Sequence, residues 1–231
     1  MKVLNIITGL GKGGAENTLY KLNIENNDET KMWNFSLSNL DYYGDLLIKN
    51  NYHALAFNIF SNPLKIISLI REINRIKPDV ILAWMYHPIL ITFLLKLIFF
   101  RTKFFWNLRG TFESSKHSLF SKLFIKISIF FSTFVPHKII CCSDQVRKNF
   151  REIGYPDNKL VTINNGYDFK YLNFDYTLKE KIRKKYKLNG ETILFGMASR
   201  FNEQKDYSNL LRALELLTKQ KSKNIKFLFA G

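Results

Sequence analysis

The chain has 231 residues and a mass of 27.2 kDa, which is enough for one large domain or two smaller ones with a sizeable hydrophobic core. Hydrophobic residues make up 46% and charged residues 23%, with 11 glycines and 5 prolines, so collagen-like, low-complexity and wholly disordered classes are excluded. The 35 Lys and Arg against 19 Asp and Glu leave a net charge of +16, which predicts an anionic partner: nucleic acid, a phosphorylated small molecule or an anionic membrane surface.

Short apolar runs alternate with helical patterns along most of the chain. This alternation predicts an α/β fold with a doubly wound parallel sheet. Pro63 opens one helix, and Ser143 is a cap for another that runs to Ile153. The expected strands cover residues 3–7, 33–40, 53–57, 80–84, 103–108, 138–142 and 160–163.

The only cysteines, Cys141 and Cys142, are adjacent in the sequence. Neighbouring cysteines rarely form a disulfide because the bond strains the backbone, so both are predicted to be reduced, buried strand residues.

The amino-terminal apolar run is short and leads directly into glycine-rich sequence, which is not the layout of a cleavable signal peptide. We therefore expect a cytoplasmic protein.

Residues 119–135 carry a wide apolar face, with polar residues recurring near helical spacing. Lys122 and Lys126 interrupt the run, which is too short to span a bilayer. No Asp or Glu lies between Glu113 and Asp144. Two interpretations follow: a helix that packs on the sheet, or one that lies on an anionic surface at the inner face of the cell membrane.

The regular alternation lapses after residue 168, and a densely basic stretch follows. A second strand–loop–helix–strand unit then covers residues 192–230. We predict an N-terminal Rossmann-like domain over residues 1–170, a basic linker or helix over 171–188, and an incomplete C-terminal domain over 189–231. A single βαβ unit of ~40 residues cannot bury both faces of its sheet, so the second domain is expected to be truncated.

Gly9, Gly11 and Gly14 satisfy G-x-G-x-x-G between a strand and a helix, the context of a dinucleotide-binding loop. Asp41, beyond the second apolar run, is placed to serve as the ribose-binding acid. Against this, Glu16 falls in the first helical turn, where its charge opposes a pyrophosphate. The loop is thus an NAD site, a loop that contacts phosphate or sugar, or a tight structural turn.

Two further features lie where ligands bind in an open α/β sheet, at the carboxyl ends of strands. Arg200 and Lys205 follow the strand over residues 193–197 and form a possible diphosphate clamp, or else are solvated loop cations. His87 follows the strand over residues 80–84 and is either an acceptor-binding or proton-carrying residue or a structural histidine. The histidines and cysteines lack metal-ligand spacing, so no metal site is predicted.

Three motifs occur in order along the chain: residues 13–16 (Gly-Gly-Ala-Glu), 165–168 (Asn-Gly-Tyr-Asp) and 200–206, which begins at Arg200 and contains Lys205. In this order and spacing the sequence resembles the retaining glycosyltransferases of family 4, from Met1 to Gly231. Residues 84–87, 105–109 and 141–143 are similar to a bacterial subgroup that makes cell-surface polysaccharides such as lipopolysaccharide or capsule.

This resemblance implies a GT-B architecture, in which one Rossmann-like domain binds the acceptor and a second binds the nucleotide-sugar donor. It also implies metal-independent transfer with retention, and no cofactor besides the donor substrate. Gly13 and Gly14 would let the backbone approach the donor phosphates or sugar. Arg200 and Lys205 would neutralise the departing diphosphate.

The candidate catalytic residues are His87 and Arg109, although many relatives have a His where Arg109 stands. Glu16, Asn165 and Asp168 are candidate acceptor-side or structural loop residues. The family's glutamate pair and base pocket lie beyond the residues present, so we expect the 231-residue chain alone to be inactive or nearly so. A truncated reading frame or a partial sequence would explain the abrupt end of the second domain. The alternative is a partner chain that supplies the missing C-terminal half.

The leading hypothesis is the N-terminal portion of a cytoplasmic, membrane-associated glycosyltransferase of the hexosyl-transferring type. It would move a sugar from a nucleotide diphosphate sugar to a growing, lipid-linked glycan. The alternatives are an NAD-dependent oxidoreductase built on Gly9, Gly11 and Gly14, and a non-enzymatic basic module that binds a membrane surface. Nucleic acid is disfavoured as a partner because the aromatic residues lie in apolar runs rather than among Lys and Arg.

Overall fold

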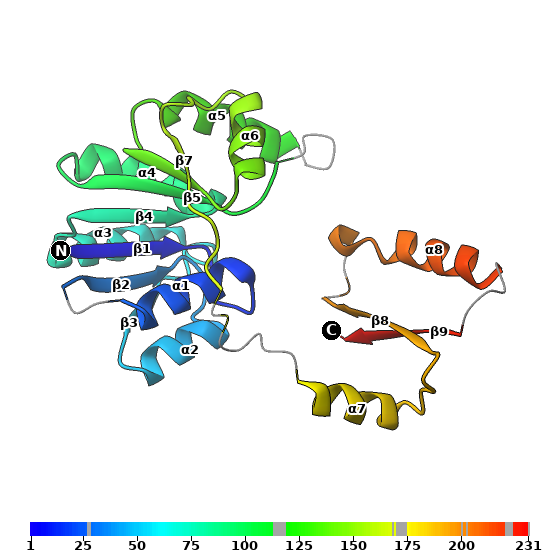
Figure 1. The fold of residues 1–231 in the computed structure, drawn as a ribbon. Helices are drawn as coiled ribbons and strands as arrows, with labels where there is room; N and C mark the ends of the chain where they lie inside the picture. Colours follow the sequence, from blue (N-terminus) through cyan, green and yellow to red (C-terminus); the bar gives the residue numbers. More distant parts are fainter. Residues whose placement is uncertain are drawn as a thin grey trace. The chain divides into compact units, whose positions relative to one another are not determined.

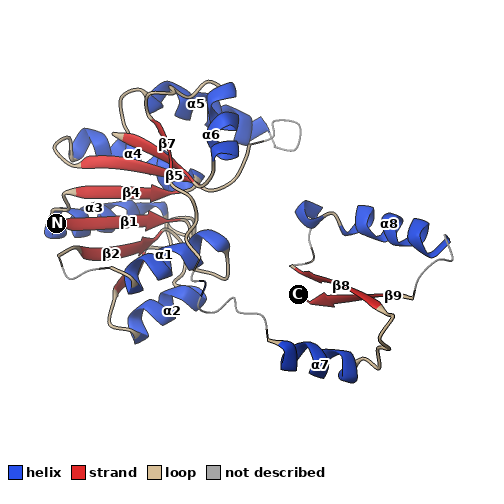
Figure 2. Cartoon of the chain, viewed as in Figure 1, coloured by secondary structure: helices blue, strands red, loops and turns tan. Residues whose placement is uncertain are grey.

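The computed structural model describes residues 1–26, 29–112, 119–167, 169, 175–199, 201, 203–219 and 224–230. The chain divides into two compact units, Met1–Gly166 and Tyr167–Gly231. Figure 1 follows the chain through both units, and Figure 2 marks their helices and strands.

Unit 1 contains a seven-stranded, all-parallel sheet in the order β3-β2-β1-β4-β5-β6-β7 (Figure 1). This order, with helices between successive strands, confirms the predicted doubly wound α/β fold. The strands are β1 (Lys2–Ile7), β2 (Lys31–Ser36), β3 (His53–Ala56), β4 (Val80–Trp84), β5 (Lys103–Leu108), β6 (Lys138–Cys141) and β7 (Leu160–Thr162). The helices are α1 (Gly14–Ile24), α2 (Asp41–Lys49), η1 (Pro63–Lys65), α3 (Ile66–Ile76), α4 (Tyr86–Ile98), α5 (Leu119–Ser132) and α6 (Asp144–Glu152).

The structure corrects several expected boundaries. Strands β3 and β7 end at Ala56 and Thr162, each one residue earlier than expected. Strand β2 ends at Ser36 instead of Leu40, because the Ser36 hydroxyl donates to the Asn39 carbonyl (2.6 Å) and turns the chain. Helix α5 ends at Ser132 instead of Val135, four residues before Pro136, which cannot continue a helix.

A further correction concerns the cysteines. Both are free thiols, but only Cys141 is a buried strand residue. Cys142 follows the end of β6 and is half-buried.

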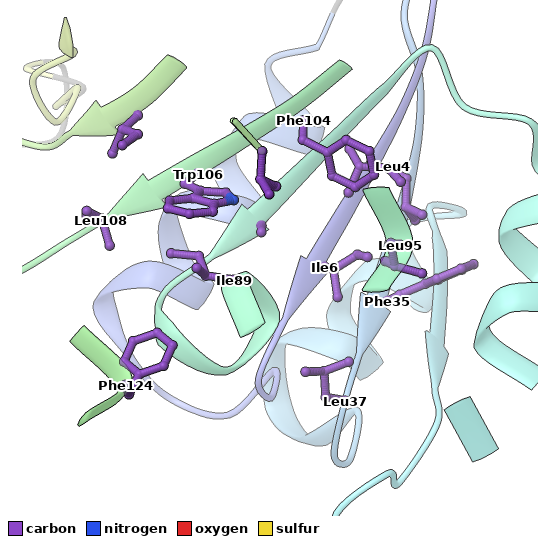
Figure 3. Close-up of a cluster of buried hydrophobic side chains, with 14 of the residues drawn as sticks. Leu4, Ile6, Phe35, Leu37, Ile89, Leu95, Phe104, Trp106, Leu108 and Phe124 are labelled. Atoms are coloured by element: carbon purple, nitrogen blue, oxygen red, sulfur yellow. The ribbon is translucent and has the colours of Figure 1, made fainter. Parts of the chain in front are cut away.

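The main hydrophobic core lies between the sheet and helices α3, α4, α5 and α6. Figure 3 shows Phe104, Trp106 and Leu108 at alternate positions of β5, with Ile89 of α4 and Phe124 of α5 among the neighbouring side chains. Alternation places these three β5 side chains on one face of the sheet. The Trp106 indole donates to the Thr92 hydroxyl of α4 (3.0 Å), so its polar atom is satisfied within the core.

A network of buried amides joins α1 to the sheet. The Asn34 and Asn23 side chains exchange two hydrogen bonds (2.8 and 3.1 Å), and Asn5 donates to the Asn34 carbonyl oxygen (3.0 Å). The Trp84 indole donates to Asn5 (3.1 Å), and Asn34 also donates to the His53 backbone carbonyl (3.0 Å). The three amide side chains are at most 1% exposed, so the bonds among them and with Trp84 form out of contact with water.

Unit 2 contains one strand–helix–strand element and a preceding helix. Strands β8 (Ile193–Ala198) and β9 (Ile225–Ala230) pair in parallel and are connected by η4 (Glu203–Lys205) and α8 (Tyr207–Lys219). The basic stretch forms α7 (Tyr176–Lys185), which Asp175 caps by accepting from the Thr177 and Leu178 amides. Its hydrogen bonds, first of all the one from the Thr177 hydroxyl, lower the pKa of the Asp175 carboxyl.

None of the helices in the described ranges is both long enough and apolar enough to cross a membrane.

We predict that Asn34→Ala lowers the free energy of unfolding by about 3 kcal/mol, because it leaves the buried Asn23 and Asn5 amides without their partner. Urea unfolding followed by tryptophan fluorescence measures this loss. The control is Asn50→Ala, an exposed amide, which should change stability by less than about 0.5 kcal/mol. Equal stability of the two variants would contradict the assigned role of the network.

Burial raises the pKa of the Cys141 thiol to about 11. A thiol with that pKa is thiolate at only about one part in a thousand at pH 8, and the thiolate is the reactive form. In a Cys142→Ser background we therefore expect Cys141 to resist iodoacetamide at pH 8 and to react after unfolding in urea. Rapid labelling of the folded chain, detected by mass spectrometry, would refute the buried placement.

Candidate functional site

The sheet of unit 1 has a topological switch point between β1 and β4. The chain leaves β1 toward β2 on one side, while β4 lies on the other side of β1. The loops that follow these two strands therefore part at the carboxyl edge of the sheet, where ligands bind in open α/β folds. The glycine loop follows β1, and Met85 and His87 follow β4.

The glycine loop leads into α1 through an open position. Gly13 is the N-cap of α1 in an extended conformation (φ −151°, ψ 170°), and Gly14 is its exposed first residue. A Cβ placed on Gly14 would meet no heavy atom within 4 Å. Among the described residues outside its own helix, none therefore occupies the position beside Gly14, as close approach of a ligand to the backbone requires.

The Glu16 carboxylate lies against the same loop. A Cβ on Gly13 would collide with the carboxylate oxygens of Glu16, so this side chain folds back over the first turn of α1. A negative charge is favourable there because it faces the positive end of the helix dipole. A dinucleotide pyrophosphate would meet this charge at close range, which disfavours the NAD interpretation, whereas sugar hydroxyls can donate to a carboxylate.

Arg109 connects the elements that form this edge. It lies just past β5, and its guanidinium donates to the Thr18 hydroxyl of α1 (3.0 Å) and to the Asn165 side chain. Thr18 in turn donates to the Gly14 carbonyl (2.9 Å). The guanidinium also lies over the Trp84 ring, 5.5 Å from its centroid. Arg109 and Asn165 are thus brought together and tie the first turn of α1 to β5 and to the loop after β7.

A strained residue sets the direction of the loop after β4. Met85 has φ 65° and ψ −166°, a left-handed conformation that non-glycine residues seldom adopt, and its amide donates to the Asn107 carbonyl (2.9 Å). His87 follows as an exposed residue in the first turn of α4. Its Nδ1 lies 3.4 Å from the Thr8 hydroxyl, and its ring packs edge-on against Phe60.

Asn107 is a residue of this edge that sequence reasoning missed. It lies on β5 paired with Trp84 of β4, and it is only 4% exposed. Its side-chain oxygen has no hydrogen-bond partner among the residues that the structure describes. Buried polar atoms without partners are uncommon, so this oxygen is a candidate acceptor for a water or ligand donor. The one sequence signal was an amide inside an apolar strand.

In unit 2, Lys205 lies on η4, between the carboxyl end of β8 and the start of α8. It is exposed and forms no ion pair within the described part of unit 2, where Lys219 pairs with Glu215. The candidate residues Arg200 and Asp168 lie outside the described residues. The described residues also contain no cluster of three His, Cys, Asp or Glu that is suited to a metal ion.

Solved structures with this fold include several sugar-nucleotide enzymes. HepE from Anabaena, in complex with UDP and glucose, superposes with a TM-score of 0.78 at 17% identity, over 100% of this chain and 62% of its own. The complex of HepE with UDP-glucose superposes with a TM-score of 0.80 at 16% identity, over 99% of this chain and 60% of the HepE chain. Sucrose-phosphate synthase from Thermosynechococcus elongatus superposes with a TM-score of 0.70 at 12% identity, over 100% of this chain and 62% of the synthase chain.

The chain thus spans about three fifths of the length of these proteins. At such identities the likeness establishes the fold, which is the GT-B-like, Rossmann-type fold of glycosyltransferases. No curated protein matches the sequence significantly. A family profile described as Glycosyltransferase Family 4 matches residues 12–171, which is more than half of the chain. The chain therefore belongs to glycosyltransferase family 4.

Proposed function

We propose that this chain carries the acceptor-side domain and part of the donor-side domain of a retaining glycosyltransferase that uses a nucleotide diphosphate sugar. The observation that carries the proposal is the open position at Gly14, beside the Glu16 carboxylate and next to the switch point of the sheet. A sugar bound there can approach the backbone closely and donate hydroxyl hydrogen bonds to Glu16. The solved HepE structures hold UDP, glucose and UDP-glucose, which supports a nucleotide sugar as the donor class.

The proposed chemistry depends on charge that builds during transfer. As the bond between the sugar and the diphosphate breaks, negative charge accumulates on the leaving phosphate. Arg200 and Lys205 are the cations that we assign to this charge, Arg200 as a fork and Lys205 as a point charge. We assign His87 to the acceptor side, as a residue that binds the acceptor or carries its proton.

We further propose that the acceptor is a lipid-linked glycan of a cell-surface polysaccharide and that the protein works at the inner face of the cell membrane. The net charge of +16 and the apolar, acid-free helix α5 support this part of the proposal. Because the chain spans about three fifths of HepE, we expect the 231-residue chain to transfer sugar poorly or not at all. Ligand binding is therefore the appropriate first test.

The test is ligand-detected NMR with UDP-, GDP- and dTDP-sugars and with NAD. We expect one nucleotide sugar to bind with a Kd on the order of 1 mM and to bind more weakly to Lys205→Ala and Arg200→Ala. NAD should show no saturable binding. Saturable binding of NAD, with none of any nucleotide sugar, would overturn the proposal.

We predict that Gly14→Ala weakens nucleotide-sugar binding at least tenfold without destabilising the fold. The new methyl group fills the open position, whereas alanine is favoured over glycine in a helix by roughly 0.5–1 kcal/mol. Parallel titrations and thermal melts measure the two effects. Gly190→Ala, also free of steric conflict but outside the glycine loop, is the matched control. Undiminished binding by Gly14→Ala would remove the glycine loop from the donor site.

Arg109→Ala should lower the free energy of unfolding by about 1–2 kcal/mol, because the guanidinium bonds to Thr18 and Asn165 are lost. Arg109→Lys keeps the charge but not the fork, so we expect it to recover less than half of that loss. Urea unfolding measures both variants. Arg75→Ala, which removes an exposed pair with Glu72, is the control and should be nearly neutral. Full stability of Arg109→Ala would contradict the connecting role.

A further inference from the structure

One surface of unit 1 leaves large apolar side chains exposed on two adjacent helices. Helices α4 and α5 pack together through the stacked rings of Phe93 and Phe131, whose centroids are 4.5 Å apart. Beside this contact lies what we call the α4–α5 face. Its exposed members on or just after α4 are Leu94, Leu97, Ile98 and Phe100, and those on or just after α5 are Leu123, Ile127, Phe130 and Phe134.

Helix α5 is apolar on two sides. Phe124, Ile125 and Ser128 are buried against the rest of unit 1. Leu123, Ile127, Phe130 and Phe134 follow one another at intervals of four, three and four residues and form a second, exposed stripe. Leu97, Phe134, Phe100 and Phe130 are 80, 70, 67 and 66% exposed. Packing on the sheet accounts for the first stripe and not for the second.

A basic hollow of about 170 Å³ adjoins this face at the amino edge of the sheet. Its charged and titratable lining residues are Lys96, Arg101, Lys103, His137 and Lys159, and Phe134 belongs to both the hollow and the face.

Two of the three lysines of the hollow are held by backbone carbonyls instead of carboxylates. Lys96 donates to the carbonyls of Phe100 (2.9 Å) and Thr102 (3.3 Å), and Lys159 donates to that of Pro136 (2.9 Å). Arg101 lies over the Phe100 ring, 5.6 Å from its centroid. No ion pair between described residues involves any of these cations. No carboxylate therefore neutralises these cations through a direct ion pair among the described residues.

The charge of the surrounding sequence has one sign. Residues 80–112 and 119–143, which contain α4, β5, α5 and β6, include no Asp or Glu. Asp79 lines a second hollow together with Arg101, and its carboxylate accepts from the Lys2 backbone amide (2.7 Å). The exposed apolar face is suited to the acyl-chain layer of a bilayer, and the cations beside it are suited to anionic headgroups.

We propose that the α4–α5 face docks on an anionic phospholipid bilayer and that the basic hollow takes a lipid phosphate. This inference deepens the proposed function, since it names the surface through which the enzyme would reach a lipid-linked acceptor. Helix α5 connects the carboxyl end of β5 to the amino end of β6, so its 14 residues, about 21 Å, run from the candidate site edge to the hollow. A helix lying in the interface thus brings the site edge to the bilayer.

Flotation of the full chain with phosphatidylcholine vesicles, with and without phosphatidylglycerol, tests the inference. The charge variant is Arg101→Gln with Lys103→Gln, and the apolar variant is Leu97→Ser. The matched controls are Lys21→Gln with Lys49→Gln and Ile48→Ser, all at exposed positions on α1 and α2. Because every changed residue is exposed, circular dichroism and thermal melting should show folded proteins throughout.

We expect binding only to vesicles with phosphatidylglycerol. The charge variant should lose about thirtyfold in partition coefficient, about fivefold for each cation. Leu97→Ser should lose roughly tenfold, and the controls should lose none. The inference is overturned if the parent chain does not bind anionic vesicles, or if the controls lose as much as the variants. It is also overturned if inorganic phosphate saturates the hollow, seen by NMR, while vesicles do not bind.

The vesicle experiment and the nucleotide-sugar binding experiment can succeed or fail independently of each other. A chain that binds a nucleotide sugar but no vesicles loses only the bilayer inference. A chain that binds anionic vesicles but no nucleotide sugar retains the docking surface and loses the glycosyltransferase proposal.

Discussion

The interaction on which the candidate site depends is the buried amide network of Asn5, Asn23 and Asn34. It ties α1 to β1 and β2 by hydrogen bonds that water cannot replace, and Trp84 extends it to β4. Because β1 and β4 border the switch point, the network joins the strands whose loops form the site. The open position at Gly14 is held in place by this interior contact and, from outside, by Arg109.

The edge built in this way separates two kinds of electrostatic surface. At the carboxyl edge of the sheet, the Glu16 carboxylate covers the first turn of α1, which suits hydroxyl groups better than phosphate. At the amino edge, cations without carboxylate partners line the hollow beside α4 and α5. In our account the first surface meets the sugar and the second meets a lipid phosphate, so four of the basic residues have a specific role at one place in the fold.

The strands and their order of appearance could be predicted from the sequence because a buried parallel strand is a continuous apolar run. Features that depend on contacts between distant residues could not. The Asn34 network and the Arg109 contact with Thr18 join residues that lie far apart in the chain. The burial of the Asn107 oxygen without a partner depends likewise on how distant segments pack around it. Met85 adopts a left-handed conformation although no glycine in the sequence indicates one there. Strand β2 ends early because the Ser36 hydroxyl donates to the Asn39 carbonyl.

The central claim is that a nucleotide sugar binds at the glycine loop of unit 1. Amide chemical-shift mapping of the full chain with UDP-glucose and the other nucleotide sugars tests it most directly. The account predicts that the largest shifts for the bound ligand fall on Gly13, Gly14 and Glu16, with a second group around Lys205. Shifts that avoid the glycine loop, or that appear there with NAD and with no nucleotide sugar, would contradict the account.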